Sequence, residues 1–222
     1  RCVLGLHETV VTGAADGYYR IAERPAATLL HLGPGLANGL ANLHNAKKAR
    51  SGIVNIVGDH TASHLALDAP LTSDIHGIAA PMSDWVHTTA CVQDIASDGA
   101  EAVRRAGARP GAIATLALPA DVAWSEVPEA HRQAHATDSP ASADSAGDAE
   151  PRDWQAIIKA LRDEPQSTLL LLGDRALRES CTLLAGKIAA ATGCAIRAEF
   201  YTARMERGTG RVRVPRLPYA VD

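Results

Sequence analysis

The chain has 222 residues, of which 46% are hydrophobic and 4% aromatic, and its formal net charge is −3. This length and hydrophobic content suffice for one large or two small domains with a real core. The small negative charge and the scarcity of aromatic residues argue against nucleic acid or an anionic membrane as the main partner. No apolar run approaches the ~20 residues needed to cross a bilayer.

Apolar runs alternate with helical patterns in the first part of the chain. Residues 2–6, 26–32, 52–57 and 111–118 are predicted strands, and residues 9–24, 36–50 and 93–106 are predicted helices. Short apolar runs that alternate with helices of this length predict βαβ units and a parallel sheet. The long polar stretch at 58–85 is expected to be functional or partly helical.

Residues 126–150 are crowded with Ala, Ser, Asp and Pro and have no apolar period, which predicts a linker. The domains are therefore expected at 1–125 and 151–222. In the second domain the pattern predicts a helix from Trp154 capped by Asp153, a buried strand at 168–172, a helix at 176–192 ended by Gly193, and a strand at 194–200. A basic, glycine-rich segment follows at 204–216.

The four cysteines are Cys2, Cys91, Cys181 and Cys194, and no two are spaced as CxxC. A zinc cage is therefore not predicted. All but Cys91 lie in apolar segments and are expected to be buried small hydrophobes. This usage favours a reducing, cytoplasmic compartment.

A carboxylate, an imidazole and a glycine-rich segment fall where two predicted strands end. Glu8 follows the first strand, and His31 ends the second, just before the Gly33-Pro34-Gly35 turn. Ligands of open parallel α/β sheets bind outside the carboxyl ends of the strands, so this edge is a candidate site. Taken singly, Glu8 can also be a helix-terminal carboxylate, His31 a neutral histidine bonded to backbone, and the turn an ordinary connection.

The motifs stand in a characteristic order: Leu6-His7-Glu8, then Ala14-Ala15-Asp16-Gly17-Tyr18, then residues 30–38 ending in Asn38, then Val54-Asn55-Ile56-Val57-Gly58-Asp59. This order resembles the pyrimidine-binding domain of thiamine-diphosphate enzymes of the acetolactate synthase and benzoylformate decarboxylase group. The resemblance covers about 1–125, and 151–222 is similar to the start of the central domain. It implies an α/β fold with a parallel sheet flanked by helices, followed by part of a second, Rossmann-like α/β domain.

The resemblance also implies an activity, namely thiamine-diphosphate-dependent decarboxylation and carboligation of small 2-oxoacids, as in acetolactate synthases. Glu8 would be the carboxylate that bonds the cofactor's aminopyrimidine, with its pKa raised in a dry cleft. The cofactor loop would comprise Gly33, Pro34, Gly35 and Asn38. His31 stands where benzoylformate decarboxylases carry a histidine implicated in proton transfer, so simple decarboxylation of an aryl 2-oxoacid is the alternative.

Members of this group hold the diphosphate through Mg²⁺ in a separate domain marked by Gly-Asp-Gly. Neither Gly58-Asp59-His60 nor Gly173-Asp174-Arg175 matches that motif. The Mg²⁺ ligands are therefore expected outside this chain, and no metal ligand is assigned within it. Some relatives also hold FAD, for which no motif of this chain gives support.

The group builds its active sites between subunits, which implies a homodimer or homotetramer. The chain begins inside a strand-like run without an initiating Met, so we expect a segment that is inactive alone. Two other hypotheses remain open: a nucleotide-binding α/β protein, disfavoured because the dinucleotide fingerprint is missing, and a non-catalytic α/β dimerisation fragment.

Overall fold

The computed structural model describes residues 2–128 and 153–219. The chain divides into two compact units, Arg1–Asp144 and Ser145–Asp222. The part of the predicted linker beyond residue 128 lies outside the described residues. Within those residues no helix combines the length and the apolarity that a bilayer span requires.

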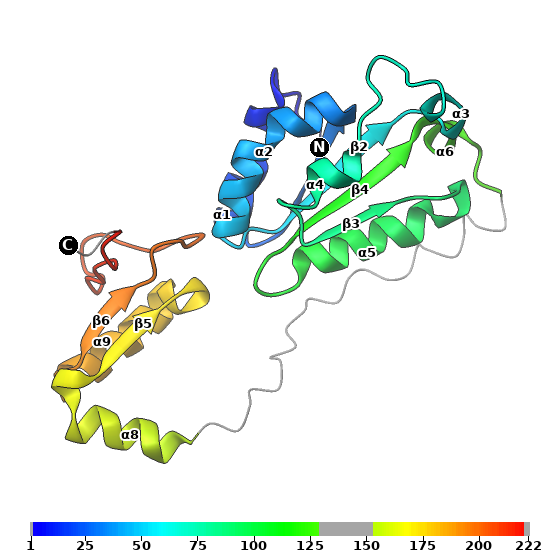
Figure 1. Ribbon diagram of the computed structural model, residues 1–222. Coiled ribbons are helices and arrows are strands. Elements are labelled where there is room, and N and C mark those ends of the chain that lie inside the picture. Colours follow the sequence, from blue (N-terminus) through cyan, green and yellow to red (C-terminus); the bar gives the residue numbers. More distant parts are fainter. Residues whose placement is uncertain (1, 129–152, 220–222) are drawn as a thin grey trace. The chain divides into compact units, whose positions relative to one another are not determined.

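Four parallel strands form the sheet of the first unit, in the order β1-β2-β4-β3 (Figure 1). They are β1 Ala26–His31, β2 Ile53–Asp59, β3 Trp85–Thr88 and β4 Ile113–Pro119. The register pairs His31 with Gly58 and Gly58 with Leu118. The carboxyl ends of β1, β2 and β4 therefore meet at one edge, as the sequence predicts for a parallel sheet.

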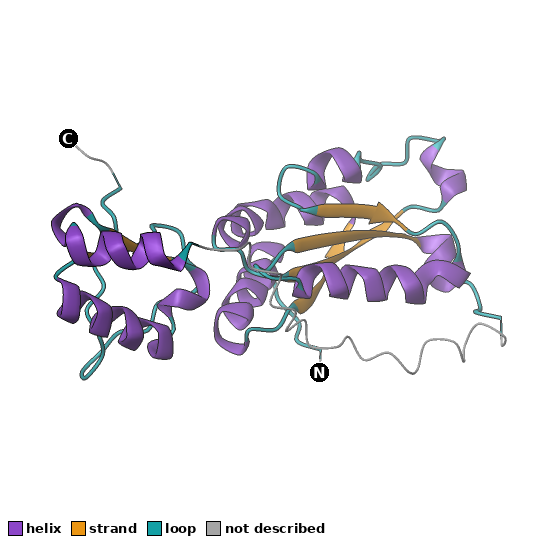
Figure 2. Ribbon diagram, turned by 90° about the horizontal axis from the view of Figure 1, so that it is seen from below, coloured by secondary structure: helices purple, strands orange, loops and turns teal. Residues whose placement is uncertain are grey.

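Helices cover both faces of this sheet (Figure 2). On one face lie α1 Glu8–Ala22, α2 Leu32–Lys48 and α4 Ile75–Ala79, and on the other lies α5 Ile95–Gly107; the shorter elements are α3 Ala62–Leu65, η1 Val92–Asp94 and α6 Ala120–Trp124. Leu30, Leu36 and Leu43 are buried in the first core. Ala102 and Ala106 of α5 pack against β2 and β4, so Leu29 of the edge strand β1 is left 74% exposed.

A chain of polar side chains crosses the sheet within the first core. The Thr28 hydroxyl donates to Asn55 Oδ1 at 2.7 Å, and Asn55 Nδ2 donates to Thr115 Oγ1 at 3.2 Å. Thr115 and Ser83 share a further bond of 2.7 Å between their hydroxyls. All four side chains are buried, and each has a partner, which removes most of the cost of burying them.

Two predictions for the first unit are wrong. Residues 2–6 form no strand, and Val3 and Leu4 are 85% and 89% exposed, because an apolar run reveals nothing about whether a neighbouring strand exists to pair with it. The Gly33-Pro34-Gly35 segment is not a turn but the first turn of α2, where a proline costs no helical hydrogen bond. The stretch 58–85 contains α3 and α4, which confirms that it is partly helical.

The second unit is a small α/β structure whose two parallel strands pair along their whole length. Its elements are α8 Trp154–Asp163, η2 Pro165–Ser167, β5 Leu169–Leu172, η3 Asp174–Leu177, α9 Glu179–Thr192 and β6 Ala195–Ala198. Leu177, Ala198 and Val214 form its core. The predicted caps are confirmed: Asp153 accepts from Ala156 N at 3.0 Å, and Gly193 ends α9 with φ of 85°.

Burial in the second unit differs from the prediction. The strand β5 is not buried on both faces, since Leu169 and Leu171 are 46% and 54% exposed. The predicted helix at 176–192 starts at Glu179, after a separate 3-10 turn. Cys194 is buried as expected, whereas Cys181, and Cys2 in the first unit, are exposed.

Candidate functional site

Glu8 is the first residue of α1. His7 precedes it with an extended backbone, and its Nδ1 accepts a hydrogen bond from Thr9 N at 3.2 Å, which caps the helix. A carboxylate in the first turn is stabilised by the unpaired N–H groups and the helix dipole. This position is compatible with both interpretations of Glu8, as a helix-terminal carboxylate and as a ligand-binding group.

Polar contacts from α2 hold the Glu8 end of α1. Asn38 Nδ2 donates to Glu8 Oε2 at 3.1 Å, and the Thr9 hydroxyl donates to the Asn38 carbonyl at 2.6 Å. One turn further along α2, Asn42 Nδ2 donates to the Thr9 carbonyl at 2.7 Å. The two helices also approach closely at Gly39, where a Cβ would lie 2.9 Å from Thr12 Cγ2. The Glu8 carboxylate is therefore positioned by α2 as well as by its own helix.

Gly35 lies between the two candidate catalytic residues. A Cβ at this position would lie 3.3 Å from both Glu8 Oε1 and His31 Cβ. The structure thus brings Glu8, His31, Gly35 and Asn38 together. Gly33 does not join them. Its nearest neighbour is the Ser73 side chain, with which a Cβ at position 33 would collide. Pro34 is exposed in the same turn of α2.

Leu32 connects β1 to α2 with a left-handed backbone, φ of 55°. For a leucine this conformation costs roughly 1–2 kcal/mol, so the surrounding structure must impose it. The leucine is itself buried, which helps to hold it in place. The strained residue directly follows His31, and strain of this kind clusters at functional sites.

The expected rise in the pKa of Glu8 is wrong for this chain. Hydrogen bonding from the backbone of Glu8 lowers the pKa of its carboxyl, and the Asn38 amide and the neighbouring His7 and His31 lower it further. Desolvation acts in the opposite direction but is weaker, because Glu8 is half-exposed. The carboxylate is ready to accept a hydrogen bond.

Sequence reasoning missed three contributors to this site, namely Thr9, Asn42 and the strained Leu32. The spacing of Asn38 and Asn42 was an available signal, because residues four apart lie on one face of a helix. The backbone of Leu32 had no signal, since leucine is an unusual choice for a left-handed conformation.

The described residues contain no group of three or more His, Cys, Asp or Glu side chains able to hold a metal ion. His60 and His64, which follow β2, face each other edge to face with ring centroids 6.5 Å apart.

Comparisons with known proteins find similarity to thiamine pyrophosphate enzymes. Residues 1–80 match the family described as thiamine pyrophosphate enzyme, N-terminal TPP binding domain. Over its full length the chain is 46% identical to IlvX of Mycobacterium tuberculosis, an acetolactate synthase large subunit by provisional assignment. The aligned segment covers 41% of IlvX. The chain is also 35% identical to the benzoylformate decarboxylase of Pseudomonas aeruginosa. That alignment covers 54% of the chain and 23% of the enzyme.

Among solved structures, the thiamine diphosphate-dependent 4-hydroxybenzoylformate decarboxylase of Rhodococcus jostii RHA1 has the same fold. The TM-score is 0.69 at 23% identity, over 89% of this chain and 37% of that one. The chain spans about two fifths of the length of IlvX and less than a quarter of the Pseudomonas enzyme.

Proposed function

We propose that this chain, whose residues 1–80 match the N-terminal TPP binding domain of thiamine pyrophosphate enzymes, supplies the pyrimidine-binding half of an acetolactate-synthase-like active site. The bound cofactor would supply the carbanion-stabilising chemistry for decarboxylation of a small 2-oxoacid and for carboligation. One observation carries this proposal: the Glu8 carboxylate is held by Asn38 and lies against Gly35 at the carboxyl edge of the sheet.

The residues present fit an aminopyrimidine ring. Glu8 would accept a hydrogen bond from, and share a proton with, a ring nitrogen, which is the role of a general acid–base carboxylate. Asn38 would keep the carboxylate oriented, because it donates to one of its oxygens from α2. Gly35 would allow the backbone to approach the ring closely. Pro34 and Gly33 would shape the same first turn of α2.

Further parts of the proposal concern the whole protein. Mg²⁺ and the diphosphate would be held by residues outside this chain, because neither Gly58-Asp59-His60 nor Gly173-Asp174-Arg175 matches the Gly-Asp-Gly motif. The enzyme would be a cytoplasmic homodimer or homotetramer, because a half-site must be completed by another domain. FAD has no supporting feature in the described residues.

Replacing Glu8 by glutamine tests the proposal in the protein that carries this chain. We expect Glu8→Gln to slow proton exchange at the cofactor's reactive carbon and pyruvate turnover by at least about a hundredfold, the contribution typical of a positioned acid or base. Glu126→Gln, which removes an exposed carboxylate outside the helices of the first unit, is the matched control and should leave both rates unchanged. Unchanged exchange in Glu8→Gln would remove Glu8 from the mechanism.

A second candidate function rests on His31. Its Cβ lies beside the same glycine as Glu8, and the residue is exposed at the end of β1. An imidazole there could move a proton to or from a bound substrate, as a benzoylformate-decarboxylase-like lyase would need. Assays of His31→Ala on pyruvate and on benzoylformate separate the two functions: a selective loss with benzoylformate favours the lyase, and equal rates to wild type exclude His31.

A further inference from the structure

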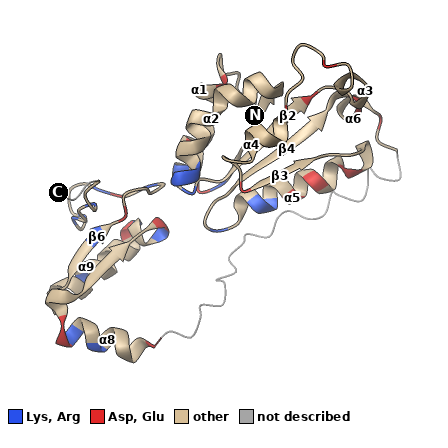
Figure 3. Ribbon diagram, viewed as in Figure 1, with Lys and Arg blue, Asp and Glu red and all other residues tan. Residues whose placement is uncertain are grey.

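The loop that follows β6 is the most basic segment of the second unit. Residues 204–216 contain five arginines and a single acidic residue, Glu206. Figure 3 marks these basic residues along the loop. The thiamine site proposed above uses none of them, so their accumulation needs a separate explanation.

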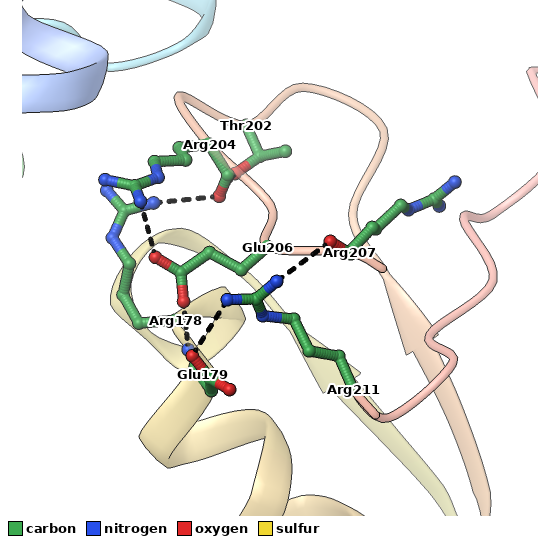
Figure 4. A network of polar contacts seen from close by, with 7 residues as sticks. All are labelled: Arg178, Glu179, Thr202, Arg204, Glu206, Arg207 and Arg211. Carbon is green, nitrogen blue, oxygen red and sulfur yellow. Dashed lines mark hydrogen bonds and ion pairs between the residues drawn. The ribbon is translucent and has the colours of Figure 1, made fainter. Parts of the chain in front are cut away.

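Two of the arginines pair with carboxylates, one within the loop and one on α9 (Figure 4). Arg204 pairs with Glu206 at 2.7 Å, and Arg211 pairs with Glu179 at 3.2 Å. Glu206 also accepts from the backbone N–H of Glu179 at 2.7 Å, which fixes the loop to the start of the helix. These contacts make a rigid base for the rest of the loop.

Arg207 and Arg213 have no carboxylate partner among the described residues. Arg207 donates to neutral acceptors, the Val214 carbonyl and the Met205 sulfur, both at 3.2 Å. Arg213 is exposed. Both arginines line a hollow of about 350 Å³. The other lining residues are Gly208, Arg211, Val212, Val214 and Pro215.

The loop backbone brings these arginines around the hollow. Gly208 and Gly210 adopt φ of 135° and 80°, which turns the chain back on itself. Arg211 then donates from its backbone N–H to Gly208 O at 3.2 Å and from Nη1 to Arg207 O at 3.3 Å. Arg207 is held by its hydrogen bond to the Val214 carbonyl. A ligand would therefore lose less binding free energy to immobilising this side chain.

We propose that this hollow binds a small phosphate-bearing anion. Each guanidinium offers five N–H donors in a planar fork that matches phosphate oxygens bidentately. Arg207 and Arg213 supply uncompensated positive charge, and Arg211 is oriented by Glu179. The volume lies at the small end of the range for ligand pockets, which suits a phosphate or diphosphate group. The inference is independent of the thiamine site, since it uses only residues of the second unit.

Calorimetry on the 222-residue chain tests this proposal with orthophosphate, pyrophosphate and adenosine monophosphate, at constant ionic strength set with sodium chloride. We expect saturable binding of pyrophosphate and a loss of affinity of about tenfold or more in Arg213→Ala, because a charge-assisted hydrogen bond contributes roughly that factor. Arg213 is exposed, so this variant should melt as wild type does. Arg213→Lys keeps the charge but loses the fork and should fall in between.

Arg162→Ala is the matched control, because it removes the same charge from an exposed position on α8 of the same unit. It should bind pyrophosphate as wild type does, and so should Glu8→Gln, which separates this site from the proposed thiamine site. Tighter binding of the nucleotide than of the inorganic ions would identify a phosphate ester as the ligand. No saturable heat with any of the three, or equal losses in Arg162→Ala and Arg213→Ala, would overturn the proposal.

Discussion

At the scale of single residues, the position of Glu8 depends on what α2 presents to it. Asn38 holds one carboxylate oxygen, and Gly35 leaves room for the other. The fit is tight, since a methyl group at Gly35 would approach both Glu8 and His31 at 3.3 Å. Small displacements of reacting groups have large effects on rates. Gly35 is therefore a positioning residue that mutation can test.

We predict that Gly35→Ala lowers the thiamine-diphosphate-dependent activity of the complete enzyme about tenfold, because Glu8 must shift by a few tenths of an ångström. The melting temperature should change little. Gly17→Ala in α1 is the control: no atom lies within 4 Å of its added methyl group. That variant should keep full activity and gain about 0.5–1 kcal/mol of stability. Equal activity in both variants would contradict the positioning role.

Glu101 provides a pH-dependent test at the same scale. Hydrogen bonds and charge from Arg104 and Arg105 lower the pKa of Glu101 from 4.5 to about 2. A lowered pKa means that the stabilisation is fully present above about pH 4.5 and is lost as the pH falls towards 2. We expect Glu101→Gln to melt below wild type at pH 7, with the difference shrinking between pH 4.5 and pH 2.

The matched control for Glu101 is Glu126→Gln, which removes an exposed carboxylate outside the helices of the first unit. Its melting temperature should follow that of wild type at every pH. A gap between Glu101→Gln and wild type that stays constant down to pH 2 would show that the arginine contacts do not stabilise the fold through this carboxylate.

At the scale of elements, the polar chain through Thr28, Asn55, Thr115 and Ser83 links three strands to the segment before β3. Because side chains alternate between the two faces of a strand, a one-residue slip would move Asn55 out of this chain and into the opposite face. The polar chain therefore specifies the strand register, in addition to the apolar residues that surround it.

We predict that Asn55→Ala destabilises the first unit by about 2–3 kcal/mol, because it leaves the buried Thr28 hydroxyl unpaired and creates a small cavity. Urea denaturation followed by circular dichroism measures the change. Asn45→Ala on the exposed side of α2 is the control and should stay within about 0.5 kcal/mol of wild type. A loss below 1 kcal/mol for Asn55→Ala would mean that the polar chain adds little.

Periodicity predicted most of these elements, and its errors have physical causes. The parallel strands at 26–32, 52–57 and 111–118 and the helices between them are confirmed within a few residues. The short strand β3 was missed because its sequence, Trp-Val-His-Thr, is not a continuous apolar run, unlike the equally short β5. The apolar run at 2–6 was misread because strand formation requires a partner, which local sequence does not encode.

Prediction of the site depended on motif order more than on local pattern. His31 ends β1 as expected, whereas Glu8 follows no strand and instead begins α1. Asn38 contacts Glu8, a contact that spacing alone could not give. The direction of the pKa shift could not be read from the sequence, because it depends on how far the carboxyl is covered and on which donors reach it. Their catalytic roles stay predictions.

At the scale of the whole molecule, each unit has a core built from its own residues. We predict that a shortened chain ending at residue 128 unfolds cooperatively, with a melting temperature within a few degrees of the matching transition in the 222-residue chain. Differential scanning calorimetry of both proteins gives the comparison. A shortened chain without a cooperative transition would show that the first unit depends on the second.

The edge position of β1 has a consequence for how this chain behaves in concentrated solution. The strand is paired on one side only, and Leu29 stands open on the face that α5 leaves bare. An unsatisfied row of backbone groups beside an apolar side chain is a template onto which a further strand can add. The edge position of β1 thus makes the isolated chain prone to self-association, and a charged side chain at position 29 is the simplest way to oppose it.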